Sequence, residues 1–494
     1  MSEKIINRRT FMKGLALGAA AALANRCQAA EPYLTTPPPN FVLIIGDDIS
    51  VDDFGCYGHP HIRTPSIDKL AKGGVRFTNA YLTASQCSPT RCSLITGRYP
   101  HNTGAPELHM PLPAGQPMFP LKLKEAGYYT VAAGKWHLGS YPKAAFSHRI
   151  GEAGPGAEDN WVNCLRERPR DKPFFMWFAA TDAHRPWQPD GEAQPHKPSD
   201  AVIPPYMADA EGTRRDLAQY YDEVQRLDRY AGLVVAELQQ QEVLENTVIM
   251  FMADNGRPFP RCKTWLWDSG IKMPLIVHWP KGVAIPGSAC NSLVSMVDIG
   301  PTILALAGLE KPSAMQGVSF AQLLKDPNRQ IREYVFAEHN WHDQAAHERM
   351  VRWKNYVYIR NAHPELDNLT AAHWDCPSYK DLFSLREQGK LSPAQAEIFR
   401  SPRPGEFLFD VSRDYHQINN IANDPTCKEV LEHLRKCMDK WQQATGDTVP
   451  TKLTPDRFDR KTGKTLSKGL VPAERGTIPG SERDAQNIND PGPR

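Results

Sequence analysis

Short, wholly apolar runs alternate along this chain with longer segments in which apolar residues recur every three to four positions. The unbroken runs predict strands buried on both faces, as in a parallel sheet covered by helices. They span residues 41–45, 130–133, 174–178, 247–252 and 275–278. The clearest helical pattern covers residues 214–241. Strands and helices in alternation predict an α/β sandwich with a large, mixed but mostly parallel sheet between helices.

The pattern changes near residue 330. Residues 334–336, 356–359 and 407–409 look like short antiparallel strands, and residues 428–445 look like a helix. From residue 451 onward the chain is rich in Pro, Gly and charge, which predicts a flexible polar tail. We therefore expect a large α/β domain over residues 31–330, a smaller α+β domain over 331–450 and a tail over 451–494.

The first 30 residues have the pattern of an export signal. Residues 8–13 read Arg-Arg-Thr-Phe-Met-Lys, similar to the twin-arginine consensus, and an apolar run of eleven residues follows at 14–24. That run is too short to span a bilayer as a stable helix, and Ala29 and Ala30 offer a cleavage point. We expect a bacterial periplasmic or exported protein that uses the twin-arginine machinery, which carries folded proteins. A membrane-retained anchor is the alternative.

Amino-acid composition narrows the classes of protein to which the chain could belong. The chain has 494 residues, 41% of them hydrophobic and 23% charged, as in ordinary soluble proteins of two domains. A formal net charge of +2 gives no indication of a nucleic-acid partner. The ten cysteines form no Cys-x-x-Cys pair, which argues against a zinc cluster.

Acidic and amide side chains follow two of the predicted strands. Asp47 and Asp48 come directly after the first strand, and Asp254 and Asn255 come after the strand at 247–252. Ligands of α/β sheets bind at the carboxyl ends of strands. These four side chains offer only hard oxygen donors, which favour Ca²⁺ or Mg²⁺ over Zn²⁺. Each pair taken alone could instead be a set of turn residues.

A second group of residues suits oxyanion chemistry. Cys87 begins the run Cys-Ser-Pro-Thr-Arg, which ends at Arg91 and is followed by Thr96-Gly97. Three further segments carry cationic or imidazole side chains, at Lys135 and His137, at His184 and at Lys263. Individually such residues are more often surface charges or satisfied polar groups, and Cys87 could be a buried or disulfide-bonded cysteine.

The order of these motifs resembles the formylglycine-dependent sulfatases of the alkaline-phosphatase-like superfamily, over roughly residues 38–426. The shared pattern runs from strand-Asp-Asp through Cys-x-Pro-x-Arg, Gly-Lys-Trp-His-x-Gly, a histidine loop and Asp-Asn-Gly to a lysine before Pro-Leu-Ile-Val. The resemblance implies that residues 31–330 form a catalytic domain. It also implies that a maturation enzyme oxidises Cys87 to formylglycine (3-oxoalanine).

Roles follow from the resemblance position by position. The ligands of one Ca²⁺, or less favourably Mg²⁺, would be Asp47, Asp48, Asp254, Asn255 and the modified Cys87. Sulfate and the aldehyde hydrate would be surrounded by Arg91, Lys135 and Lys263. His137 would act as the base that releases sulfate, and His184 with Lys263 would protonate the leaving group.

The substrate is less closely defined. Stretches such as Asp254–Pro260 resemble the heparan N-sulfatases (sulfamidases), although those carry arginine where this chain has Lys263. The resemblance implies a sulfated polysaccharide such as a glycosaminoglycan, and it leaves sulfate ester and sulfamate both open. His339, Trp341 and His342 could contact the sugar or simply pack. Two other classes remain, a phosphoester or phosphonate hydrolase of the same superfamily and a non-catalytic glycan-binding protein with unmodified Cys87.

Overall fold

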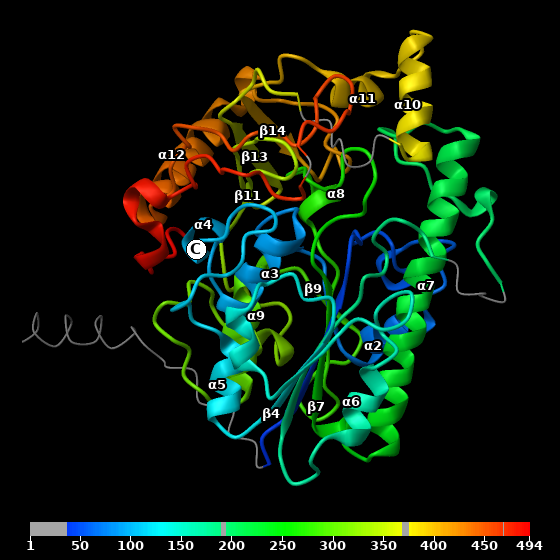
Figure 1. The fold of residues 1–494 in the computed structure, drawn as a ribbon, viewed down its shortest axis with the longest axis vertical. Helices are drawn as coiled ribbons and strands as arrows, with labels where there is room; N and C mark the ends of the chain where they lie inside the picture. Colours follow the sequence, from blue (N-terminus) through cyan, green and yellow to red (C-terminus); the bar gives the residue numbers. More distant parts are fainter. Residues whose placement is uncertain (1–36, 189–193, 368–374, 468) are drawn as a thin grey trace, which may run out of the picture.

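A computed structural model describes residues 37–188, 194–367, 375–467 and 469–494 (Figure 1). The predicted export signal at 1–30 lies outside these residues. Within them, no helix is long and apolar enough to cross a membrane. The structure confirms the predicted fold class, with a mixed, mostly parallel eight-stranded sheet between helices and a separate four-stranded antiparallel sheet.

The large sheet has the strand order β5-β4-β6-β1-β7-β8-β2-β9. Its central strand β1 (Asn40–Gly46) lies parallel to β6 (Phe174–Ala179) and β7 (Thr247–Ala253), and every residue of these three strands is buried. Double-sided burial explains their unbroken apolar runs. The other strands are β4 (Tyr129–Gly134), β5 (His148–Ile150), β8 (Leu275–His278), β2 (Val75–Phe77) and β9 (Ser288–Cys290). The pairings of β8 with β7 and with β2 are antiparallel.

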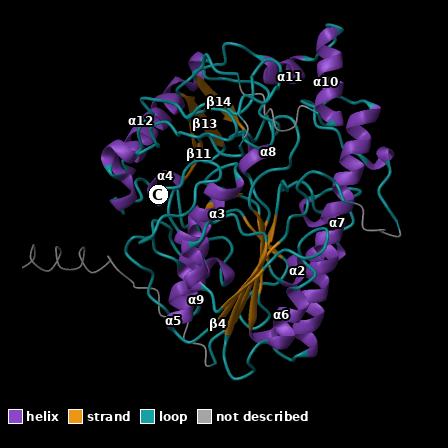
Figure 2. Cartoon of the chain, in the orientation of Figure 1, coloured by secondary structure: helices purple, strands orange, loops and turns teal. Residues whose placement is uncertain are grey.

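Two layers of helices enclose this sheet (Figure 2). Alternate residues of β1 enter separate cores, with Phe41, Leu43 and Ile45 in one and Val42 and Ile44 in the other. One face is covered by α2 (Pro65–Gly73), α6 (Trp161–Glu167) and α7 (Glu211–Gln240). The opposite face is covered by α3 (Cys87–Thr96), α5 (Phe119–Glu125) and α9 (Ile299–Leu306). Shorter elements are β3 (Ala80–Tyr81), β10 (Val294–Ser295), α4 (Pro100–Thr103), α8 (Asp268–Ile271), α10 (Pro377–Glu387) and α11 (Pro393–Ala396).

The smaller sheet joins β11 (Tyr334–His339), β12 (Glu348–Trp353), β13 (Tyr356–Asn361) and β14 (Glu406–Asp410) in that order. Helix α12 (Lys428–Thr445) covers it, and Met438 and Trp441 share a core with Phe336 and Leu408. Strand β12 is not predicted by the sequence pattern, because Glu348, Arg349 and Arg352 interrupt its apolar residues. A domain boundary at residue 330 stays a prediction.

The C-terminal segment, residues 451–494, makes polar contacts with the main body, although its composition predicts a flexible tail. Buried Arg98 donates hydrogen bonds to Gln486 O and Ile488 O, both at 2.9 Å, and to Asn489 Oδ1 at 2.7 Å. Arg475 of the segment contacts Glu107 Oε2 at 2.6 Å and Leu108 O at 2.7 Å. Polar contacts therefore hold this segment against the main body. Its few apolar residues give no indication of such packing in the sequence.

Candidate active site

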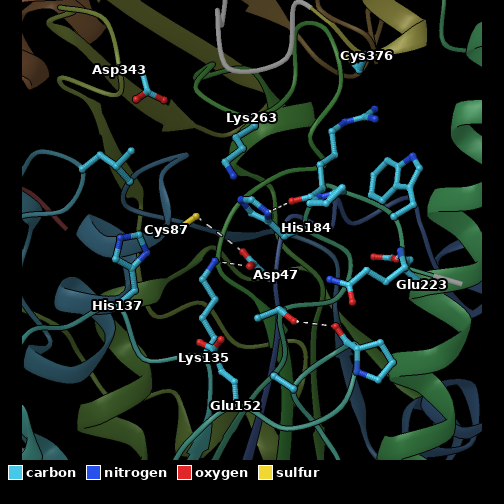
Figure 3. A pocket seen from close by; sticks show the side chains of 18 of the residues that line it. Asp47, Cys87, Lys135, His137, Glu152, His184, Glu223, Lys263, Asp343 and Cys376 are labelled. Carbon is cyan, nitrogen blue, oxygen red and sulfur yellow. Dashed lines mark hydrogen bonds and ion pairs between the residues drawn. The ribbon is translucent and has the colours of Figure 1, made fainter. Parts of the chain in front are cut away.

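Cys87 lies at the first residue of α3, where backbone N–H groups are free to face an anion. Its side chain is buried, and Sγ lies 3.8 Å from Asp47 Oδ1 and 3.9 Å from Asp48 Oδ1 (Figure 3). Burial first of all, together with the charges of Asp47 and Asp254, raises the pKa of the thiol to about 12, although Lys135 and Lys263 oppose the shift. The unmodified thiol is therefore a poor nucleophile at neutral pH, because thiolate is the reactive form.

The neighbouring strands β1 and β7 deliver a cluster of carboxylates to the same point. Asp47 and Asp48 follow β1, and Asp254 follows β7, which pairs with β1 in parallel. Consecutive side chains of a strand point to opposite faces, but Asp48 has φ +58°, so both carboxylates turn toward Cys87. One ligand atom from each of Asp47, Asp48, Cys87 and Asp254 lies within 4.8 Å of the others.

Asn255 completes a donor set that fits a hard divalent cation. Its Nδ2 donates to Asp48 Oδ1, which leaves Oδ1 of the amide buried without a hydrogen-bond partner among the described residues. An orphaned buried carbonyl oxygen is costly unless something binds it. Together with the three carboxylates, this oxygen offers the ligand type that Ca²⁺ and Mg²⁺ prefer.

Three cations pair with the three carboxylates. Lys263 Nζ lies 2.7 and 2.8 Å from the two carboxylate oxygens of Asp48, and Lys135 Nζ contacts Asp47. Burial alone would raise the pKa of Asp48, but the charges of Lys263, His184 and Lys135 hold it at about 2. The Asp48 carboxylate is thus ionised at neutral pH. Asp254 differs, because burial and the charge of Asp47 raise its pKa.

Arg91 lies behind this cluster and does not line the cavity. Its Nε donates to Asp254 Oδ2 at 2.8 Å and its Nη1 to Lys135 O at 3.1 Å. Its side chain is completely buried. Arg91 therefore positions Asp254 and the main chain at Lys135, while its Nη2 is buried without a hydrogen-bond partner among the described residues.

His137 and a second histidine, His109, form a hydrogen-bonded pair. His109 Nδ1 lies 2.7 Å from His137 Nε2, and the His109 backbone N–H donates to Ser88 Oγ at 2.8 Å, one residue after Cys87. Burial and the charge of Lys135 lower the pKa of His137, and burial lowers that of His109 to about 4. Both rings are therefore neutral at pH 7, and one of the two nitrogens donates to the other in their hydrogen bond. His109 could not be singled out from the sequence because no motif surrounds it.

His184 approaches from the opposite side. Its Nε2 lies 3.9 Å from Asp48 Oδ2, and burial together with Lys263 lowers its pKa. A cavity of about 890 Å³ brings it together with six other residues that the sequence singled out, Asp47, Cys87, Lys135, His137, Lys263 and His342. Figure 3 shows the lysines and histidines arranged around Cys87 and Asp47. The cluster offers general bases, an anion-binding cradle and a cation site within one cavity.

Two of the three expected sugar contacts are not on this cavity. His339 is buried at the end of β11, where its Nδ1 lies 2.8 Å from Glu348 Oε2. Trp341 is also buried and donates from Nε1 to Pro455 O at 2.8 Å. His339 is thus bonded within the smaller sheet and Trp341 to the C-terminal segment, so other residues occupy both side chains. Only His342 lines the cavity, beside Asp343.

Comparison with known proteins decides the family. A sequence model described as "Sulfatase" matches residues 39–309, more than half of the chain. The chain belongs to the sulfatase family. As a member it is a sulfuric ester hydrolase. A second model, "N-sulphoglucosamine sulphohydrolase, C-terminal", matches residues 261–388 of this sulfatase, in agreement with the sulfamidase-like stretches of the sequence.

Relatives of this sulfatase act on different substrates. An ulvan-active sulfatase of Formosa agariphila is 30% identical over 83% of this chain and 75% of its own length. Human N-sulphoglucosamine sulphohydrolase is 28% identical over 85% of this chain and 92% of its own length. Identities near 30% establish the family and leave the substrate open.

Solved structures share the fold. One is a complex with its substrate D-glucosamine-2-N,6-O-disulfate, with a TM-score of 0.65, 19% identity and coverage of 82% of this chain and 98% of the other. Another is the phosphonate monoester hydrolase of Agrobacterium radiobacter, with a TM-score of 0.64, 18% identity and coverage of 84% and 98%. At these identities the likeness shows a common architecture and nothing of the substrate.

Proposed function

We propose that this sulfatase removes sulfate from a sulfated glycan, using a formylglycine derived from Cys87 and one Ca²⁺. The observation that carries the proposal is the position of Cys87. Its sulfur lies within 4 Å of two buried carboxylates in a cavity that also holds Lys135 and Lys263. A thiol whose pKa is raised to about 12 is a poor nucleophile there, whereas a hydrated aldehyde at the same position could attack sulfur.

The hydrate would supply two hydroxyls, one to attack sulfur and one whose deprotonation expels sulfate. Asp47, Asp48, Asp254 and Asn255 would hold the Ca²⁺, which would offset negative charge on the sulfate oxygens. Lys135 and Lys263 would add positive charge at the same place, because their Nζ atoms contact Asp47 and Asp48.

Proton transfer is assigned to the two sides of the cavity. His137 would accept the proton of the second hydroxyl, because its imidazole lines the cavity with Cys87, is neutral at working pH and is oriented by the hydrogen bond of its Nε2 to His109. His184 protonates the departing oxygen or nitrogen, with Lys263 beside it. In the reaction cycle His184 therefore has to take up a proton before each turnover.

The glycan assignment is supported by the relatives, which include ulvan-active sulfatases and N-sulphoglucosamine sulphohydrolase. Both O-sulfate and N-sulfate remain candidate linkages, because Lys263 stands where sulfamidases carry arginine. We also propose export by the twin-arginine route and conversion of Cys87 by a separate maturation enzyme before export. The residues at 1–30 support the first of these.

The test combines chemistry and activity. Protein purified from its native host is digested, and the peptide that contains residue 87 is weighed for aldehyde or hydrate. The same preparation is assayed for sulfate release from glucosamine 6-O-sulfate, glucosamine N-sulfate and an aryl sulfate, with a phosphonate monoester as the counter-substrate. Cys87→Ala, which cannot be converted, is the matched control.

We expect the aldehyde and sulfate release that is lost in Cys87→Ala. An unmodified thiol in folded, exported protein would refute the mechanism and favour a glycan-binding role. Turnover of the phosphonate ester alone would instead assign the chain to phosphonate hydrolysis.

A further inference from the structure

We propose that the C-terminal segment, residues 451–494, forms part of the substrate site, where its Arg457 together with Asp343 binds hydroxyls of the sugar that carries the sulfate. The inference rests on the proposed function, since it assigns the part of the same cavity that recognises the sugar. The segment lies outside the residues matched by either family model, 39–309 and 261–388. Neither family model therefore accounts for it.

The segment is a fixed wall of the cavity. Arg457 and Leu470 line the cavity that also contains Cys87 and His137. The main chain near Arg457 is held at Pro455, which accepts a hydrogen bond from Trp341, and at Arg457 itself, whose N–H donates to Asp343 O at 2.7 Å. A cation delivered on so constrained a backbone is pre-organised for a ligand.

The guanidinium of Arg457 is only partly used within the protein. Nη1 donates to Asp343 Oδ1 at 3.0 Å, and Nε is buried without a hydrogen-bond partner among the described residues. No hydrogen bond to a described residue uses Nη2, and the side chain is 21% exposed. Nη2 is therefore the donor that remains for a ligand in the cavity.

Asp343 and Arg457 together match a sugar better than a second anion. Arg457 balances the charge of Asp343, and His342 Nδ1 lies 3.3 Å from Asp343 Oδ2. A second sulfate or carboxylate would meet the Asp343 carboxylate, whereas a hydroxyl can donate to Asp343 and accept from Arg457 at once. Neighbouring ring hydroxyls are the groups that fit such a donor–acceptor pair.

His109 connects this pair to the reacting centre. It is hydrogen-bonded to His137 on one side, and on the other it lies within electrostatic reach of His342, Asp343 and Arg457. All of them line the cavity of about 890 Å³, which is far larger than a sulfate group alone requires. The cavity thus has a sulfate end at Cys87 and a sugar end at Arg457.

The experiment compares two substrates in matched variants. Wild type, Arg457→Gln and Arg475→Gln are each assayed on the sulfated glucosamine that wild type cleaves and on an aryl sulfate, which has the sulfate but no sugar hydroxyls. Arg475 is the control because it anchors the same segment, through Glu107 and Leu108, and does not line the cavity.

For Arg457→Gln we expect kcat/KM on the sugar sulfate to fall at least about tenfold, mainly through KM, as for loss of a charge-assisted hydrogen bond. Activity on the aryl sulfate should change less than about twofold, and Arg475→Gln should leave the ratio of the two activities unchanged. If Arg457→Gln does not fold, Arg457→Lys, which can keep the contact with Asp343, is measured in the same two assays and should show the same selective loss.

Equal losses on both substrates, or the same selective loss in Arg475→Gln, would overturn the assignment of Arg457 to sugar binding. Failure of the proposed function itself looks different, because wild type would then release sulfate from neither substrate.

Discussion

Replacing Arg98 with methionine should detach the end of the C-terminal segment. Three of the hydrogen bonds from its guanidinium reach this segment, at Gln486, Asn489 and Ile488, over 2.7–2.9 Å. At about 1 kcal/mol net for each bond, the segment loses about 3 kcal/mol of its attachment. Each 1.4 kcal/mol is tenfold, so the detached state should become roughly 100-fold more populated.

Limited proteolysis measures this population. When opening is fast relative to cleavage, the cutting rate follows the fraction of open molecules. Native protein is treated with thermolysin, and loss of the segment is followed by intact mass. Cleavage within residues 451–494 should be roughly 100-fold faster in Arg98→Met than in wild type. Arg483→Met is the control, since Arg483 is exposed on the same segment. Equal cutting rates in all three proteins would refute the reasoning.

Other predictions concern the metal, the histidine pair and acid stability. Chelation should abolish sulfate release and lower the melting temperature, both restored by Ca²⁺; unchanged activity in metal-free protein would contradict the metal assignment. His109→Asn should lower kcat about tenfold at nearly constant KM, because His137 loses its orienting partner. The loss is smaller than the 10²–10⁴-fold that a general base supplies, since His137 itself is still present. An unchanged kcat would show that His109 does not orient His137. Burial would raise the pKa of Asp447, but Arg349 holds it below the ordinary value. The ionised Asp447 carboxylate thus stabilises the fold above about pH 4, and this stabilisation is lost as the pH falls further. Asp447→Asn should have a lower melting temperature than wild type at pH 7. Between pH 7 and pH 3 its melting temperature should fall less than that of wild type.

The candidate metal ligands could be predicted from sequence because their positions depend on local structure. Unbroken apolar runs identify β1 and β7, and the side chains that follow two parallel neighbours meet at one edge of the sheet. Asp47, Asp48 and Asp254 therefore come together wherever the two strands pair. Cys87 joins them because its motif begins a helix directly.

The sugar end of the cavity could not be predicted in this way. Arg457 reaches it through contacts with residues more than 100 positions away, and its own segment has almost no apolar pattern. His339 and Trp341 were expected on the cavity because their polar and aromatic groups suit sugars, yet partners that sequence cannot reveal bury both of them. Strand β12 escaped notice for the same reason, since buried Arg349 is paired with the distant Asp447 at 2.7–2.8 Å.

The contacts of Arg98 also set an order of events during biosynthesis. Cys87 is 3% exposed in the folded protein, so the proposed maturation enzyme would have to reach the chain before α3 is enclosed. Arg98 lies just beyond the end of that helix, and its partners include Asn489. These bonds cannot form until translation has passed residue 489. About 400 codons separate Cys87 from Asn489, so some 20 to 80 seconds pass at 5–20 residues per second before Arg98 can gain its last partner. The proposed maturation enzyme would have this interval to reach Cys87.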